Sequence, residues 1–229
     1  MNNKGFTLVE LIVSMAIGLV VMAAIYAATE MGQRSSVAIE RKVVAQQDAR
    51  AALDIMALEI GMASFNPNFA GSIWVDGPAG PACGVISGNQ AYRGIQEAMV
   101  NSITVEMDIG QSSVINDDSN EIIRYNYDTG NQYITRSTNC GGAYAFLGAQ
   151  SGNPREVRVV NNTAGVSLFT YYDGNDDQIP YANLPASIPD IRRIRITLVV
   201  DTEAIDRSLN RRRRTISSTS IIPRNHAIN

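Results

Sequence analysis

The chain opens with a stretch of almost purely apolar side chains. Residues 6–29 number twenty-four, and Glu10 is the only charged side chain among them. A helix of that length can cross the hydrocarbon core of a bilayer, which is about 30 Å thick. Lys4 is the only basic side chain ahead of it, and basic flanks stay on the cytoplasmic side. The pattern predicts one membrane-spanning helix with the rest of the chain exported.

The spacing of apolar positions changes after residue 29. Residues 30–62 contain no proline, and apolar side chains recur among charged ones with helical spacing. This predicts an amphipathic helix that continues the first, for a total length of about 85 Å at 1.5 Å per residue. The polar stretch 33–47 is expected to be an exposed neck, and the apolar positions from residue 53 onward are expected to contact a globular head. Gly61 predicts the end of the helix.

Alternation of apolar and polar side chains replaces the helical spacing beyond residue 62. Such alternation predicts half-buried strands, and turn-forming residues such as 128–131 separate them. The alternating segments are residues 103–109, 123–127, 157–159, 166–172, 194–200 and 216–222. The predicted fold class is α+β, in which a long N-terminal transmembrane and amphipathic helix packs on an antiparallel β-sheet head at residues 63–229.

Composition narrows the properties of that head. The chain has 229 residues, of which 45% are apolar, and a net charge of −3. One acidic domain with a real core is expected, and no specific nucleic acid partner, because phosphate binding needs an excess of basic side chains. The two cysteines, Cys83 and Cys140, lack the spacing of a metal site. Export favours a disulfide between them, worth roughly 4 kcal/mol, with two buried thiols as the alternative.

A specific motif lies where the apolar stretch begins. It is the string Lys4-Gly5-Phe6-Thr7-Leu8-Val9-Glu10-Leu11. This string resembles the processing and assembly motif of type IV pilins and of the pseudopilins of type II secretion. The resemblance implies that a prepilin peptidase cleaves between Gly5 and Phe6 and that Phe6 is then N-methylated. It divides the chain into a leader (1–5), a transmembrane and assembly half of the helix (6–29), a periplasmic amphipathic half (30–62) and the head (63–229).

Glu10 is an ionisable side chain inside the predicted span. A charge at this depth is costly and is usually retained only with a partner. The resemblance implies that its carboxylate accepts the ammonium group of Phe6 on a neighbouring subunit, which would set the register of assembly. The alternative is a glutamate that reaches back to the edge of the membrane. No proline interrupts the span, whereas many major pilins carry one there, and this difference favours a minor subunit.

The order of elements over most of the chain resembles the PilW-type minor pilins and the related J-type pseudopilins. The segment 171–174, the strand region 191–200 and the pair Arg224-Asn225 carry this likeness. It implies a minor type IV pilin that primes a pilus or sits in its tip complex, in the inner membrane with a periplasmic head and later in the filament. The implied partners are other minor and major pilins or pseudopilins, the prepilin peptidase, the inner membrane and the pilus assembly platform.

Two alternatives to this function remain open. One is a J-type minor pseudopilin of a type II secretion system. The other, of a different class, is a surface- or ligand-binding, adhesin-like tip module in which the head makes the functional contact. An enzyme is not expected, because the sequence has no phosphate-binding loop, nucleophile elbow or zinc-binding helix motif. The single histidine, His226, lies near the C-terminus, where we expect a frayed chain.

Two charged segments offer further chemistry. Asp173, Asn175 and Asp177 place oxygen ligands at alternate positions, as the start of a Ca²⁺-binding loop does, but Gln178 and Leu184 depart from the rest of that pattern. The alternative is an acidic surface turn, and no other cofactor is expected. Residues 211–214 are four arginines, which could contact phosphate groups or an acidic neighbouring subunit. The alternative for them is a solvated turn between two strands or ion pairing with acidic side chains of the head.

Overall fold

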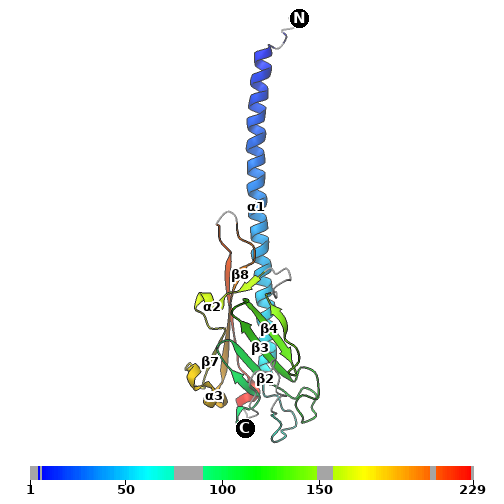
Figure 1. The fold of residues 1–229 in the computed structure, drawn as a ribbon, viewed down its shortest axis with the longest axis vertical. Coiled ribbons are helices and arrows are strands. Elements are labelled where there is room, and N and C mark those ends of the chain that lie inside the picture. Colours follow the sequence, from blue (N-terminus) through cyan, green and yellow to red (C-terminus); the bar gives the residue numbers. More distant parts are fainter. Residues whose placement is uncertain (1–4, 6, 75–89, 149–156, 207–209, 228–229) are drawn as a thin grey trace.

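A computed structural model describes residues 5, 7–74, 90–148, 157–206 and 210–227. One helix, α1 (Leu8–Gly61), rises out of a β-rich head, with the N-terminus at its far end and the C-terminus at the opposite end of the molecule (Figure 1). The absence of proline allows fifty-four residues to form one uninterrupted helix. The predicted long helix, antiparallel head and α+β class are confirmed.

The head begins on α1 earlier than predicted. The buried side chains of the helix recur every three or four residues, which places them on one face. They are Ala45, Ala49, Ala52, Leu53, Met56 and Ile60. The expectation that residues 33–47 form an exposed neck is therefore wrong at its end, because Ala45 is already buried. Alanines are too small to signal a core in the sequence, yet they let strands approach the helix closely.

The first sheet of the head is an antiparallel meander. Its strands are β1 (Ile95–Ala98), β2 (Ser102–Glu106), β3 (Ile122–Asp128), β4 (Tyr133–Thr138) and β5 (Tyr144–Leu147), in the order β1-β2-β3-β4-β5. The predicted strand 103–109 is shorter than expected and ends at residue 106. Its side chains are all buried instead of alternating. A one-turn 3₁₀ helix, η1 (Gln90–Tyr92), precedes β1.

The second sheet is built around its longest strand. The strands are β6 (Val157–Val159), β7 (Phe169–Tyr172), β8 (Arg193–Thr202) and β9 (Arg214–Ile221). β9 pairs with β8 from residue 194 to residue 201, so β6 and β7 share the other edge of β8 end to end. Short helical turns connect the strands: α2 (Asn161–Ala164), η2 (Tyr181–Asn183), α3 (Leu184–Ser187), η3 (Ile188–Asp190) and η4 (Arg224–Ala227).

The core joins both sheets to α1. The helix contacts β8 and β9 of the second sheet and β5 of the first. Tyr125, Phe169 and Tyr171 are among the largest fully buried side chains of this core. The second half of α1 is therefore part of the head's own core, and the boundary at residue 62 separates secondary structure but not packing units.

Candidate functional site

The first turn of α1 holds Glu10 in a reciprocal cap. Thr7 is the N-cap residue, and its hydroxyl accepts the backbone N–H of Glu10 at 3.3 Å. In return, the Oε2 atom of Glu10 accepts the backbone N–H of Thr7 at 3.0 Å and its hydroxyl at 2.9 Å. This capping box satisfies donors that a helix N-terminus otherwise leaves unpaired. It also fixes the carboxylate beside the predicted cleavage point, where Gly5 is exposed and Phe6 lies outside the described residues.

The cap uses one of the two carboxylate oxygens. Among the described residues, no hydrogen bond or ion pair reaches Oε1 of Glu10, whose side chain is exposed. A negative charge at a helix N-terminus is favoured by the helix dipole. In an apolar medium, the remaining oxygen still needs a donor. The geometry therefore leaves this oxygen available to an ammonium group from another chain.

The first half of α1 presents apolar side chains on all sides. Residues 8–29, called the span below, are exposed or nearly so, and α1 is the one described helix long and apolar enough to cross a membrane. A helix that is apolar all round and uncovered by its own protein requires lipid or other helices around it. Its small residues, such as Gly18 and Ala24, allow other helices to approach closely.

A buried ion pair holds the head on the second half of α1. The carboxylate of Glu59 accepts Nη2 and Nε of Arg136 on β4 at 2.6 and 3.0 Å, and it also accepts the hydroxyl of Tyr125 on β3. Both charged side chains are close to nine-tenths covered. Burial, then the hydrogen bond and charge of Glu59, raises the pKa of Tyr125 well above its ordinary value. We call Glu59, Arg136 and Tyr125 the Glu59 clamp. No sequence motif predicted it.

The expectation of a frayed chain at His226 is wrong. It lies in η4, is fully buried, and its Nε2 atom lies 2.9 Å from the carbonyl oxygen of Ile188. Its Nδ1 atom lies 3.0 Å from Oγ of Ser64 and 3.1 Å from the carbonyl oxygen of Arg93. Burial, as the largest cause, lowers the pKa of His226. The histidine thus fastens the C-terminal turn to the segments that follow α1 and η1, which is a structural role.

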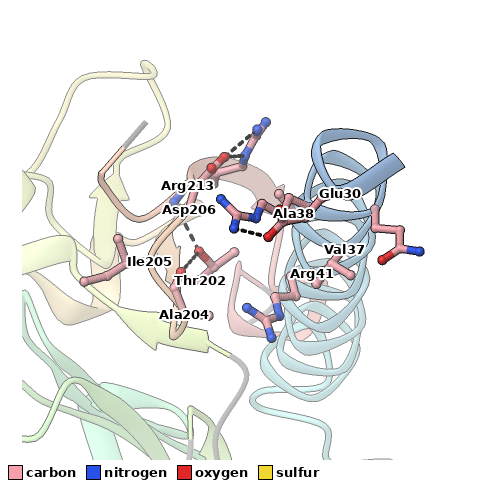
Figure 2. Close-up of a pocket in the computed structure, with 11 residues that line it drawn as sticks. Glu30, Val37, Ala38, Arg41, Thr202, Ala204, Ile205, Asp206 and Arg213 are labelled. Carbon is pink, nitrogen blue, oxygen red and sulfur yellow. Dashed lines mark hydrogen bonds and ion pairs between the residues drawn. The ribbon is translucent and has the colours of Figure 1, made fainter. Parts of the chain in front are cut away.

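Residues 211–213 of the arginine run lie in the loop between β8 and β9, in line with the predicted turn, and Arg214 is the first residue of β9. Arg213 pairs with Asp206 at 2.6 Å, and Arg214 forms two hydrogen bonds with Asp201 at 2.8 and 3.0 Å. Ion pairing with acidic side chains is therefore confirmed for these two arginines. The loop lies beside α1 just beyond the span, across a cavity of 380 Å³ (Figure 2).

The residues considered for Ca²⁺ form a turn. Oδ1 of Asp173 accepts the backbone N–H groups of Asn175 and Asp177 at 2.9 and 3.0 Å, which uses that oxygen within the loop. The metal hypothesis for these three residues stays a prediction.

Sequence reasoning missed a second acidic group. In it, Asp117, Asp118 and Glu121 bring carboxylate oxygens within 4.8 Å of one another and could hold a cation. However, Oε2 of Glu121 already accepts three backbone N–H groups, which accounts for its burial without a metal.

The predicted disulfide would join Cys140 to Cys83. Cys83 lies outside the described residues, so its pairing stays a prediction. Cys140 follows β4 and packs, half-buried, against a small apolar cluster formed by Ile73, Ile115 and Ile122. Ile122 is the first residue of β3, so the cluster lies where β3 begins.

Comparison with known proteins bears on the N-terminus. Residues 1–26 match a family profile described as the prokaryotic N-terminal methylation motif. This motif supports a type IV pilin-like protein. It implies a pilin or pseudopilin precursor that is processed by prepilin peptidase and assembles with other pilins. Searches of curated proteins and of solved structures gave no match, so the head is interpreted from its own geometry.

Proposed function

We propose that the chain is a minor type IV pilin that primes pilus assembly or occupies a place in the tip complex. One observation carries this proposal: the uncovered apolar half of α1 carries Glu10 in its first turn, while the head packs only on the other half. A subunit divided in this way is held by lipid before assembly. It exchanges lipid for neighbouring helices during assembly, and Glu10 sets the register by binding the amine of another subunit.

Two features support a minor subunit over the main building block. The helix is unbroken through the span, whereas many major pilins carry a helix-breaking proline there. The head is also large, because it contains two sheets on one helix. We propose a PilW-type subunit on this basis, with the head in the periplasm before assembly.

Substitution of Glu10 tests the assembly role. Glu10→Val should leave membrane insertion intact and reduce incorporation into filaments, because it removes the carboxylate without shortening the span. Ser14→Val is the matched control, since the Ser14 hydroxyl only bonds the carbonyl oxygen of Leu11 within the helix. Unchanged incorporation of the Glu10 variant would contradict the proposal.

Mass spectrometry of the native chain should show loss of residues 1–5 and one methyl group on Phe6.

Deletion of the gene separates the two filament systems. If the chain primes a pilus, surface pili should become few while the secretion of exported hydrolases continues. If secretion stops and pili are retained, the chain is a J-type pseudopilin. The expected results for N-terminal processing and for Glu10→Val would be the same in that case, because pilins and pseudopilins share the processing and assembly motif.

A cavity at the end of the head away from the span favours a second candidate function, a ligand-binding tip module. It has a volume of 780 Å³ and is lined by Phe69, Trp74 and Arg93, among others. The Phe69 side chain is 80% exposed, and exposed aromatic side chains are typical of binding surfaces. Cells carrying Phe69→Ser should keep their pili and adhere less. Equal adherence of the variant and unsubstituted cells would contradict the ligand-binding function and leave only the assembly role.

A further inference from the structure

Strand β9 runs along α1 and away from the span. Arg213, just before the strand, lines a cavity together with Arg41. At the other end, a Cβ atom placed on Gly61 would lie 3.6 Å from Cγ2 of Ile221, the last residue of β9. At 1.5 Å per residue, Arg41 and Gly61 lie about 18 and 48 Å beyond Thr29, the last residue of the span. The headgroup layer is only about 5 to 8 Å thick, so the neighbours of β9 in an assembly are protein and not lipid.

One edge of β9 is bonded to β8, and its outer edge has no strand partner among the described residues. Opposite residues of an antiparallel ladder alternate between pairs that exchange hydrogen bonds and pairs that do not. The backbone N–H of Thr197 donates to the carbonyl oxygen of Leu168, on the side of β8 away from β9. Its ladder partner Ser218 therefore points its own N–H and C=O groups away from β8. The period of two adds Ile216 and Ser220 to the outer edge, and no hydrogen bond from a described residue reaches the backbone of these three there.

The outer edge of β9 lacks the features that usually keep exposed strands from pairing, which are charged side chains, proline, bulges and short length. Residues 215–222 contain no charged side chain, proline or glycine. The pairing with β8 runs for all eight residues of β9 without a shift in register. Ile216 and Ile222 are 62% and 63% exposed. An open edge of this kind is what an added strand from another chain requires.

Basic side chains gather at the end of β9 nearest the span. Lys42 and residues 211–214 line a cavity of 610 Å³, in which Asp201 is the one acidic residue of the described lining. Within the described part of the chain, no carboxylate lies within ion-pair distance of Lys42, Arg211 or Arg212. Acidic side chains of a partner would complement these charges.

We propose that the outer edge of β9 accepts an extended segment of a neighbouring pilin-like subunit as an added antiparallel strand, with acidic side chains of that segment beside Lys42, Arg211 and Arg212. The inference rests on the proposed assembly role of the chain. All pairings between the described strands of the head are antiparallel, and β9 runs away from the span, so the added strand runs toward the membrane. The β9 strand of a second copy does not meet this requirement, because two copies in one membrane point the same way.

Hydrogen exchange at single-residue resolution tests the edge in the full chain. In the unassembled subunit in detergent, the amides of Ser217 and Thr219 should exchange slowly, because they bond to β8, and those of Ile216 and Ser218 should exchange fast. In purified filaments or tip complexes, the two fast amides should slow by about tenfold or more, since a hydrogen-bonded amide exchanges only after local opening. Fast exchange of both in the assembled chain would overturn the proposal. Absence of the chain from every assembly would refute the assembly role and this inference with it.

A photo-crosslinker identifies the occupant. Ile216→benzoylphenylalanine is introduced into the full chain in cells that assemble the filament, and the crosslinked peptide is sequenced by mass spectrometry. It should come from an extended, acidic segment of another subunit. Val114→benzoylphenylalanine is the matched control, because Val114 is 52% exposed in the loop between β2 and β3, and it should not crosslink to that segment. A crosslink from position 216 to β9 of a second copy or to a helix would overturn the proposal.

Two variants separate the edge from the fold. Ser218→Pro removes an N–H group that does not bond β8, and proline is tolerated at such edge positions. The variant should fold and be incorporated several-fold less, whereas Ser218→Thr keeps the N–H group and should be incorporated normally. Arg211→Glu combined with Arg212→Glu should also reduce incorporation, because it repels an acidic partner. Normal incorporation of both the proline and the charge-reversed variants would overturn the proposal.

Discussion

Removal of the carboxylate of Glu59 should loosen the head from α1. Glu59→Ala leaves the guanidinium of Arg136 and the hydroxyl of Tyr125 without their shared acceptor in a largely buried place. Breaking one side of a buried ion pair costs about 3–5 kcal/mol. For a domain of this size, each kcal/mol changes the melting temperature by roughly 2–4 °C. We therefore expect the melting temperature to fall by about 10 °C.

The assay is thermal unfolding of the full chain in detergent micelles, followed by circular dichroism. Glu30→Ala is the matched control, because Glu30 pairs with Arg34 one turn later on the same helix and both side chains are about half exposed. Loss of that pair should cost under about 0.5 kcal/mol. The double variant Glu59→Met with Arg136→Met should recover part of the loss, since apolar groups of similar volume can replace a buried pair.

Two results would refute this reasoning. If Glu59→Ala costs no more than Glu30→Ala, the Glu59 clamp does not hold the head. If the double variant costs the sum of the costs of Glu59→Met and Arg136→Met measured singly, the two side chains act independently in spite of their contact.

Two further predictions concern His226 in η4 and Gly94, which lies just before β1. Because burial lowers the pKa of His226 from 6.5, the folded chain binds fewer protons than the unfolded chain. The stability from the neutral ring is thus present above pH 6.5 and lost as the pH falls, by up to about 1.4 kcal/mol per pH unit. Urea titrations at about pH 7.5 and about pH 5.5 should show a drop that His226→Gln abolishes, and equal drops would contradict this. Gly94 has φ +81°, and a Cβ there would lie 2.8 Å from the backbone of Ser64. Gly94→Ala should therefore cost more than about 1 kcal/mol, whereas Gly142→Ala, which points into open space, should melt like the unsubstituted chain.

The sequence predicted the features that depend on neighbours along the chain. The span followed from an apolar run without proline, and β3, β8 and β9 followed from alternation within each segment. The strands β1, β4 and β5 were missed. β5 has only one buried side chain, Leu147, and therefore no alternation to detect.

Features that join distant segments could not be predicted. Glu59 and Arg136 are 77 residues apart, and nothing in either neighbourhood distinguishes them from exposed charges. The burial of His226 depends on Ile188 and Arg93, which come from two other parts of the chain. Ala45 falls within the predicted neck because its side chain is too small to mark a core. In each case the tertiary contact, and not the local pattern, decides the environment.

The pairing of β9 with β8, and its packing on α1, bears on how the subunit is made. α1 precedes β9 in the chain, so with the proposed export of the head α1 enters the membrane before β9 crosses it. Until β9 has crossed, the buried face of α1 from Ala45 to Ile60 lacks the strand that packs on it. Contacts this distant in sequence form slowly, and uncovered apolar surface invites misassembly in the meantime. A newly inserted subunit is therefore expected to need protection between export of its first helix and arrival of its last strand.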